Sequence, residues 1–242
     1  MSGQVVCKQI IPYTEIPNTL SEDKPIIFWD TCSLLYFVTL FNRHAYKEFQ
    51  WDAELLSLIE NGSVYSVTSS VVLKEFNHHY ASFQRFDVEY ENGLKNLLKK
   101  YAELMTNPQK EELEKGADAL NVSEKLDEMI IRLWSCTYVI DEDDYFMSYA
   151  HKRTLMKVAP SSEKDSYKDC YIWLTYLKMC DMLTIKGKSY FMTENPKDYC
   201  GNSGDIPLSD IQEDMKLYNG KLFLSKSRLT IALKKSLGLI PE

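Results

Sequence analysis

Side chains that could bind a metal ion through oxygen occur at four separate places in this chain. Three of these places follow an apolar run that is typical of a strand, and the fourth lies near the start of a helix, after the loop 159–165. The residues are Asp30, Glu75, Asp169 and the neighbouring pair Asn195 and Asp198. Because ligands of open parallel sheets bind at the carboxyl ends of the strands, we expect these side chains to gather at one sheet edge.

Carboxylates that are brought together in this way repel one another unless a cation lies among them. Ligands that are all oxygen suit Mg²⁺ or Mn²⁺, which keep several waters and bind phosphate oxygens. One or two such ions, about 3.5–4 Å apart, can activate a water for in-line displacement at a phosphodiester. The pattern therefore predicts metal-dependent phosphodiester hydrolysis. Asn195 could hold the metal or a water through its amide oxygen, or Asp198 could supply the last carboxylate.

Ordinary structural roles are also open to these residues. Asp30 could cap the helix that follows it, and Asp169 could be a first-turn acid that the helix dipole favours. Glu75 could be a solvated charge on a helix face. Lys168, next to Asp169, could contact a phosphate or lie free on the surface.

The elements that must position these residues alternate between strands and helices. Short apolar runs predict strands at 25–29, 64–67, 136–140, 188–192 and 221–224. Helical spacing predicts helices at 31–42, 47–60, from about 70 to 83, from about 144 to 158, 166–180 and 227–236. Strands that alternate with helices indicate a parallel sheet with helices on both faces. We expect one domain over 25–242, a loosely ordered lead-in over 1–24, and a charged helical insertion at about 84–135.

Composition narrows the class of protein. The chain has 242 residues, of which 45% are hydrophobic and 26% charged, as is typical of a globular protein. Its net charge of −7 excludes binding to nucleic acid through bulk positive charge. The six cysteines show no paired spacing, and neither a secretory signal nor a membrane-spanning run is visible. We therefore expect a cytoplasmic protein with reduced thiols.

Four motifs together resemble the PIN-domain nucleases. The segment 27–35, Ile-Phe-Trp-Asp-Thr-Cys-Ser-Leu-Leu, is similar to the opening of that family, and 66–76 is similar to its second motif, in which a helix carries the acidic Glu. The segment 166–173 resembles the third motif, and 190–199 the fourth. The motifs occur in the family's order, and the approach to Asp169 most resembles the longer bacterial PIN-like proteins. Cys32 replaces the Asn or Ser of many relatives, and Asn195 replaces an Asp.

The resemblance implies a three-layer α/β sandwich with a central, mostly parallel sheet and a helical insertion. It further implies an endoribonuclease that uses Mg²⁺ or Mn²⁺. Asp30, Glu75, Asp169 and Asp198 would be catalytic, and the same four with Asn195 would hold the metal. We expect Lys168 and Thr193 to contact the substrate. RNA, or single-stranded DNA, would be the binding partner, and both a homodimer and an inhibitory protein partner are compatible with the family.

Two other functions fit the same residues. The replacement at Asn195 is compatible with a PIN-like module that binds RNA or protein without cutting. The same chemistry could also act on DNA, because no residue that would read a 2′-hydroxyl can be identified in the sequence.

Overall fold

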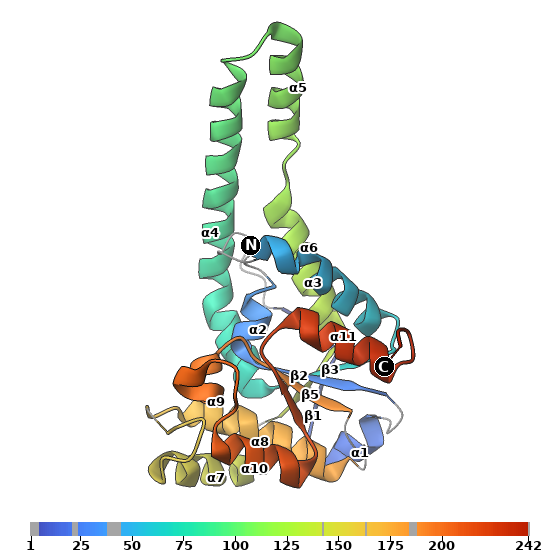
Figure 1. Ribbon diagram of the computed structural model, residues 1–242, viewed down its shortest axis with the longest axis vertical. Coiled ribbons are helices and arrows are strands. Elements are labelled where there is room, and N and C mark those ends of the chain that lie inside the picture. The colour runs from blue at the N-terminus through green and yellow to red at the C-terminus, as the bar shows by residue number, and fades with distance from the viewer. Residues whose placement is uncertain are drawn as a thin grey trace.

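A computed structural model describes residues 5–20, 24–37, 45–141, 143–162, 164–183 and 188–241 of the chain, without the side chains of 45–49 and 203. These residues form one six-stranded sheet (Figure 1), in which every neighbouring pair is parallel and the strand order is β1-β4-β3-β2-β5-β6. The strands are β1 (Gln9–Ile11), β2 (Ile26–Trp29), β3 (Tyr65–Ser69), β4 (Thr137–Ile140), β5 (Ser189–Met192) and β6 (Lys221–Phe223).

Helices cover both faces of the sheet, as Figure 1 shows. The α-helices of the described residues are α1 (Ile16–Thr19), α2 (Thr31–Leu35), α3 (Ala45–Glu60), α4 (Ser70–Ala102), α5 (Asn107–Asp118), α6 (Val122–Ser135), α7 (Asp144–Leu155), α8 (Tyr167–Met182), α9 (Pro196–Cys200), α10 (Ser209–Tyr218) and α11 (Lys226–Ser236). One layer contains α7, α8 and α10, and the opposite layer contains α3, α6 and α11. The predicted three-layer α/β fold is therefore confirmed.

The centre of the sheet is apolar because helices cover its strands on both sides. All four residues of β2 and all four of β5 are buried. Phe28 of β2 lies beside Phe191 of β5 in register, and their rings stack at 5.9 Å. Trp173 of α8 packs edge-on against Phe191 from the layer beneath. This packing fixes the adjacent ends of β2 and β5, where the predicted site begins.

The predicted lead-in is wrong for residues 9–20, which are part of the fold. The strand β1 pairs with β4 and extends the sheet by one strand. Ile11, Ile16 and Leu20 are buried in the main core. Apolar residues at these positions anchor the segment to the edge of the sheet.

Two predicted helix ends are also wrong. The helix predicted at 31–42 ends as α2 at Leu35, because the chain turns so that Phe37 packs edge-on against Trp29 at 5.5 Å; residues 38–44 lie outside the described part. The helix predicted to end near residue 83 continues to Ala102. Its inner face is buried at Asp87 and Glu91, so contacts with a neighbouring helix extend it.

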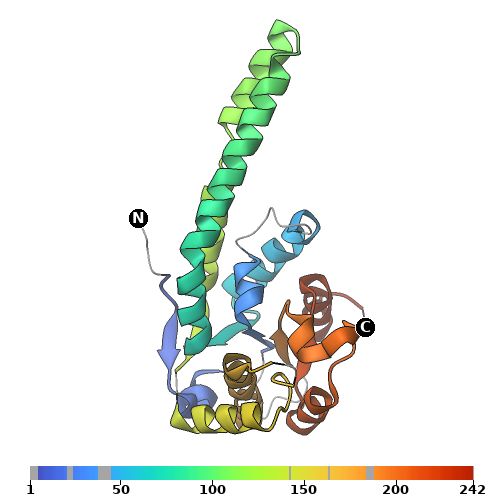
Figure 2. The ribbon, with the colours of Figure 1, turned by 90° about the vertical axis from the view of Figure 1, so that its left-hand side faces the viewer.

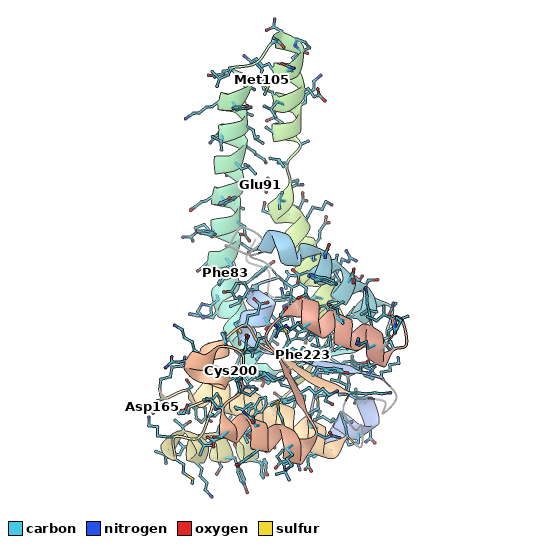
Figure 3. The ribbon with its side chains drawn as sticks, in the orientation of Figure 1. Phe83, Glu91, Met105, Asp165, Cys200 and Phe223 are labelled. Carbon is cyan, nitrogen blue, oxygen red and sulfur yellow. The ribbon has the colours of Figure 1, made fainter. Side chains whose placement is uncertain are left out.

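Residues 84–121 of the helical insertion predicted at about 84–135 form a long projection from the sheet layers, visible in Figures 1 and 2, whereas its last helix, α6, packs against α3 and β4. We call residues 84–121 the arm; it contains the outer part of α4 and all of α5. Figure 3 labels Phe83 at the base of the arm, Glu91 along it and Met105 near its tip. Among the described residues, no helix has the length and apolar character needed to cross a membrane.

Candidate active site

Asp30 is the first residue after β2 and caps α2. Its side chain is 3% exposed and accepts hydrogen bonds at both oxygens. Oδ1 accepts from the backbone N–H of Thr31 at 2.7 Å, and Oδ2 accepts from the Thr193 hydroxyl at 2.7 Å and the Cys32 thiol at 3.0 Å. Burial raises the pKa of Asp30, these hydrogen bonds oppose the increase, and the charge of Glu75 adds to it. Asp30 is thus both a helix cap and an oriented carboxylate at the sheet edge.

Glu75 lies in the second turn of α4 and faces the same edge. Its Oε2 accepts a hydrogen bond from the Thr31 hydroxyl at 2.7 Å, so Glu75 and Asp30 are bridged by one residue. Its Oε1 lies 2.8 Å from Nζ of Lys168, an ion pair between α4 and α8. Three elements, α2, α4 and α8, therefore meet at Glu75.

Asp169 and Asp198 complete the group from the other side. Asp169 lies in the first turn of α8, and Asp198 lies in the first turn of α9 and is buried. Oδ2 of Asp198 pairs with Nζ of Lys164 at 2.9 Å. Figure 3 labels Asp165 and Cys200, which mark the loop before α8 and the end of α9.

The four carboxylates influence one another electrostatically. The pKa of Asp169 is raised to about 7, first by burial and then by the negative charges of Asp30 and Asp198; a hydrogen bond with Ser166 and the charge of Lys164 oppose the increase. Since Glu75 acts on Asp30 in the same direction, each carboxylate is coupled to at least one other. The lysines that pair with them, Lys164 and Lys168, are 61% and 60% exposed, so water weakens their compensation.

This donor set fits a hard divalent cation. Carboxylate oxygens that are partly buried and incompletely compensated are the ligands that Mg²⁺ and Mn²⁺ prefer. In the described part of the chain, the side chains as they stand form no group of three His, Cys, Asp or Glu residues arranged to hold a metal ion. A cation would therefore have to draw the carboxylates closer together, at the expense of the lysine contacts.

The structure distinguishes the roles of Asn195 and Asp198. The amide nitrogen of Asn195 donates a hydrogen bond to Oδ2 of Asp198, and its backbone N–H donates to the Thr193 hydroxyl at 3.1 Å. Asp198 is the carboxylate that acts on Asp169. Of the two predicted alternatives, Asp198 is thus the one that lies in the carboxylate group, and Asn195 orients it.

The two predicted substrate contacts differ in accessibility. Thr193 is fully buried, and its hydroxyl donates to Asp30, so direct contact with substrate does not fit this placement. Thr193 instead orients the carboxylate. Lys168 is mostly exposed and lies at the rim, where a phosphate could reach it.

Two supporting groups escaped sequence reasoning. Cys32, noted above only as a replacement, donates to Asp30 and accepts from the backbone N–H of Glu194 at 3.2 Å. Lys226, 2% exposed, lies 2.7 Å from Asp52 and 3.7 Å from Glu194. No sequence pattern indicated this buried ion pair, because Lys226 lies thirty-two residues after Glu194 and a lone lysine in a helix ordinarily faces water.

Comparison with protein families agrees with this geometry. The model of the PIN domain matches residues 27–199, which include every predicted site residue. The chain therefore belongs to the PIN-domain family, whose fold is of the nuclease type. Comparisons with curated proteins and with solved structures give no match.

Proposed function

We propose that this protein is a metal-dependent endoribonuclease. The observation that carries the proposal is the group of four carboxylates from α4, α8, α9 and the end of β2, which influence one another electrostatically and leave negative charge incompletely compensated. Membership in the PIN-domain family supports a hydrolase that acts on phosphodiester bonds. Mg²⁺ or Mn²⁺ would balance this charge.

Asp30, Asp169 and Asp198 would hold the cation, with Glu75 completing its surroundings. When bound, the ion supplies an activated water and neutralises charge that develops on the phosphate. The protein's own part is orientation: Thr193 and Cys32 fix Oδ2 of Asp30, and Thr31 links Asp30 to Glu75. No side-chain nucleophile is required.

The exposed lysines at the rim would hold the nucleic-acid backbone. Lys164 and Lys168 each contact one carboxylate of the group and are more than half exposed, so both can also reach an incoming phosphate. Lys197 of α9 is exposed next to Asp198. This local positive charge makes phosphate binding compatible with a net charge of −7.

One feature favours a second function, a binding module without cleavage. Lys164 already pairs with Asp198, and Lys168 with Glu75. If these lysines hold the carboxylates permanently, the protein would bind RNA through its rim without a metal. A third possible function is cleavage of DNA instead of RNA, which the experiment in the next paragraph distinguishes.

The test is cleavage of end-labelled single-stranded RNA and of DNA with the same sequence. Each substrate is incubated with the protein and Mn²⁺, Mg²⁺ or EDTA, and binding is measured in parallel by fluorescence anisotropy. We expect internal cuts in RNA with Mn²⁺ or Mg²⁺ and none with EDTA. Binding that is equal in EDTA, without cleavage of any strand, would contradict the proposal and support the binding module. Cuts in DNA alone would show a deoxyribonuclease.

A further inference from the structure

The outer surface of α4 carries a stripe of exposed apolar side chains along the arm. Phe86, Tyr90, Leu97, Tyr101 and Leu104 are between 46% and 82% exposed. With Gly93 they recur every three or four residues, which places those within α4 on one face of the helix; Leu104 lies in the turn just after α4 ends at Ala102. In Figure 2, α4 lies in front of the rest of the arm.

This stripe is distinct from the face that holds the arm together. Glu91 is buried and accepts hydrogen bonds from the backbone N–H of Ser123, at 2.8 Å, and from its hydroxyl. Lys99 pairs with Asp118 of α5 at 2.6 Å. Folding of the chain thus uses another face of α4 and leaves the stripe exposed.

Gly93 has no explanation within the chain. A glycine in the interior of a helix destabilises it relative to alanine. A Cβ built at Gly93 would meet no atom of the described residues within 4 Å, so neither close packing among them nor a special backbone conformation requires glycine there. A small residue on an exposed apolar stripe is what close approach of a second helix would need.

The residues of the stripe are spaced almost symmetrically about residue 95, so the stripe reads nearly the same from either end of the helix. Phe86 and Leu104 lie nine residues on either side of residue 95, and Gly93 and Leu97 lie two residues on either side. A second copy of α4 in the reverse direction would place Phe86 opposite Leu104 and Leu97 opposite Gly93. A parallel copy would place Gly93 opposite itself and leave a gap.

Charged residues beside the stripe match the same arrangement. Arg85, Glu89, Lys100 and Glu103 lie on one flank of it, and none is in an ion pair with another described residue. In the reversed copy, Arg85 lies two residues along the helix from the position opposite Glu103, and Glu89 lies one residue from the position opposite Lys100, so these long side chains can reach each other. Both pairs join opposite charges, which favours the antiparallel direction.

We propose that two copies of this protein associate through antiparallel pairing of α4. The exposed parts of the stripe amount to about 500 Å², comparable to the largest apolar patch of a typical monomer, which is about 300–600 Å² and often functional. The charged flank adds to this surface, toward the ~800 Å² that each partner contributes to a stable interface. At about 1.5 Å per residue, the two sheet bodies would lie roughly 75 Å apart, at opposite ends of the paired arms. The inference does not depend on nuclease activity.

Sedimentation equilibrium over a range of concentrations tests the pairing. We expect a species of twice the 28.2 kDa chain mass. Leu97→Glu should raise the dimer dissociation constant at least about tenfold. Leu217→Glu is the matched control, because Leu217 is an exposed apolar residue of α10, 74% accessible, outside the arm. It should leave the dissociation constant unchanged.

Charge reversal tests the direction. Glu89→Lys alone and Lys100→Glu alone should each weaken the dimer, since each places like charges together, and the double variant should restore it. Gly93→Leu should weaken the dimer without lowering the helix content measured by circular dichroism, which separates loss of pairing from misfolding. The proposal would be overturned by a protein that stays monomeric at about 100 µM. It would also be overturned by a dimer whose dissociation constant does not change in Leu97→Glu, or by a double charge reversal that does not recover the native dissociation constant.

Discussion

Asp30 accepts hydrogen bonds at both carboxylate oxygens, so its neighbours fix its orientation before any ligand binds. The backbone N–H of Thr31 donates to Oδ1 and the hydroxyl of Thr193 donates to Oδ2, each at 2.7 Å. For Asp169, burial and the charges of Asp30 and Asp198 raise the pKa to about 7. The residues of the site therefore divide into one rigid carboxylate and one whose charge depends on pH near neutrality.

Metal binding should depend on pH through Asp169. Because its pKa is raised to about 7, the group is mostly protonated at pH 6, and a cation must displace that proton. We expect the affinity for Mn²⁺ to rise roughly tenfold between pH 6 and pH 8, measured by electron paramagnetic resonance of free Mn²⁺. Asp169→Asn should bind more weakly and lose most of this dependence. An affinity of the native protein that does not change with pH would contradict the assignment.

Thr193 should act as a positioning residue for Asp30. Thr193→Val keeps the buried shape and removes the hydroxyl that donates to Oδ2. Residues that orient metal ligands contribute about 10–100-fold to metal affinity or activity, so we expect Mn²⁺ binding to weaken within that range. Thr193→Ser should recover most of it. Equal affinities of the valine and serine variants would show that the hydroxyl has no such role.

Among the elements, α11 closes the site from outside the matched family region. Lys226 lies at its first position, 2% exposed, with Asp52 of α3 at 2.7 Å and the ring of Phe37 at 4.1 Å. It also lies 3.7 Å from Glu194, whose backbone N–H donates to Cys32. The ion pair thus connects two helices to the loop after β5, which carries Thr193 and Asn195.

Breaking this ion pair should destabilise the fold. Lys226→Met leaves Asp52 buried without its cation, which typically costs about 3–5 kcal/mol of the free energy of unfolding. Urea denaturation measures the loss. Because a buried pair replaced by apolar residues is often neutral, Lys226→Met combined with Asp52→Leu should recover much of the stability. A single variant within about 1 kcal/mol of the native protein would show that the pair is not structural.

The base of the arm contains a second group that should titrate near neutrality. Asp87 is 2% exposed, and its Oδ1 has no hydrogen-bond partner within the described part of the chain. Burial, and then the charge of Asp127, raises its pKa from an ordinary 3.8 to about 7. Since the pKa is higher in the folded state, the contribution of Asp87 is most favourable below about pH 4 and is lost as pH rises through about 7.

Asp87→Asn should therefore stabilise the protein at alkaline pH. We expect a gain on the order of 2 kcal/mol at pH 8, which shrinks toward pH 5 as the native carboxyl becomes protonated. Chemical denaturation at the two pH values, followed by circular dichroism, gives the difference. A variant less stable than the native protein at pH 8 would mean that Asp87 is charged there and paired favourably.

At the scale of the whole molecule, a sheet body with a carboxylate site carries a long helical arm. The site lies at the ends of β2 and β5, while α4 begins beside it at Ser70 and extends away into the arm. One helix thus contributes Glu75 to the site and the apolar stripe to the proposed pairing surface. In the proposed dimer, two separate sites would face distant stretches of substrate.

Residue types and spacing predicted much of this arrangement. The buried strands are apolar runs in the sequence, which predicted them. Asp30, Asp169 and Asp198 lie close enough to influence one another electrostatically, while their role as metal ligands stays a prediction. The predictions that were wrong depended on tertiary contacts. The segment 9–11 forms the strand β1 because it pairs with β4, and α4 continues past residue 83 because Glu91 on it binds Ser123 of α6. The roles of Thr193 and Lys226 depend on burial, which no local pattern encodes.

The central claim is that Asp30 serves metal-dependent cleavage of RNA. Its most direct test is the single-turnover cleavage rate of single-stranded RNA in Mn²⁺ for the native protein, Asp30→Asn and Asp165→Asn. Asp165 is the control, an aspartate near the site that is 77% exposed and pairs only with Lys157 among the described residues. We predict that Asp30→Asn, shown to be folded, loses at least about a hundredfold in rate, while Asp165→Asn cuts like the native protein. Cleavage that survives Asp30→Asn undiminished would contradict this account of the site.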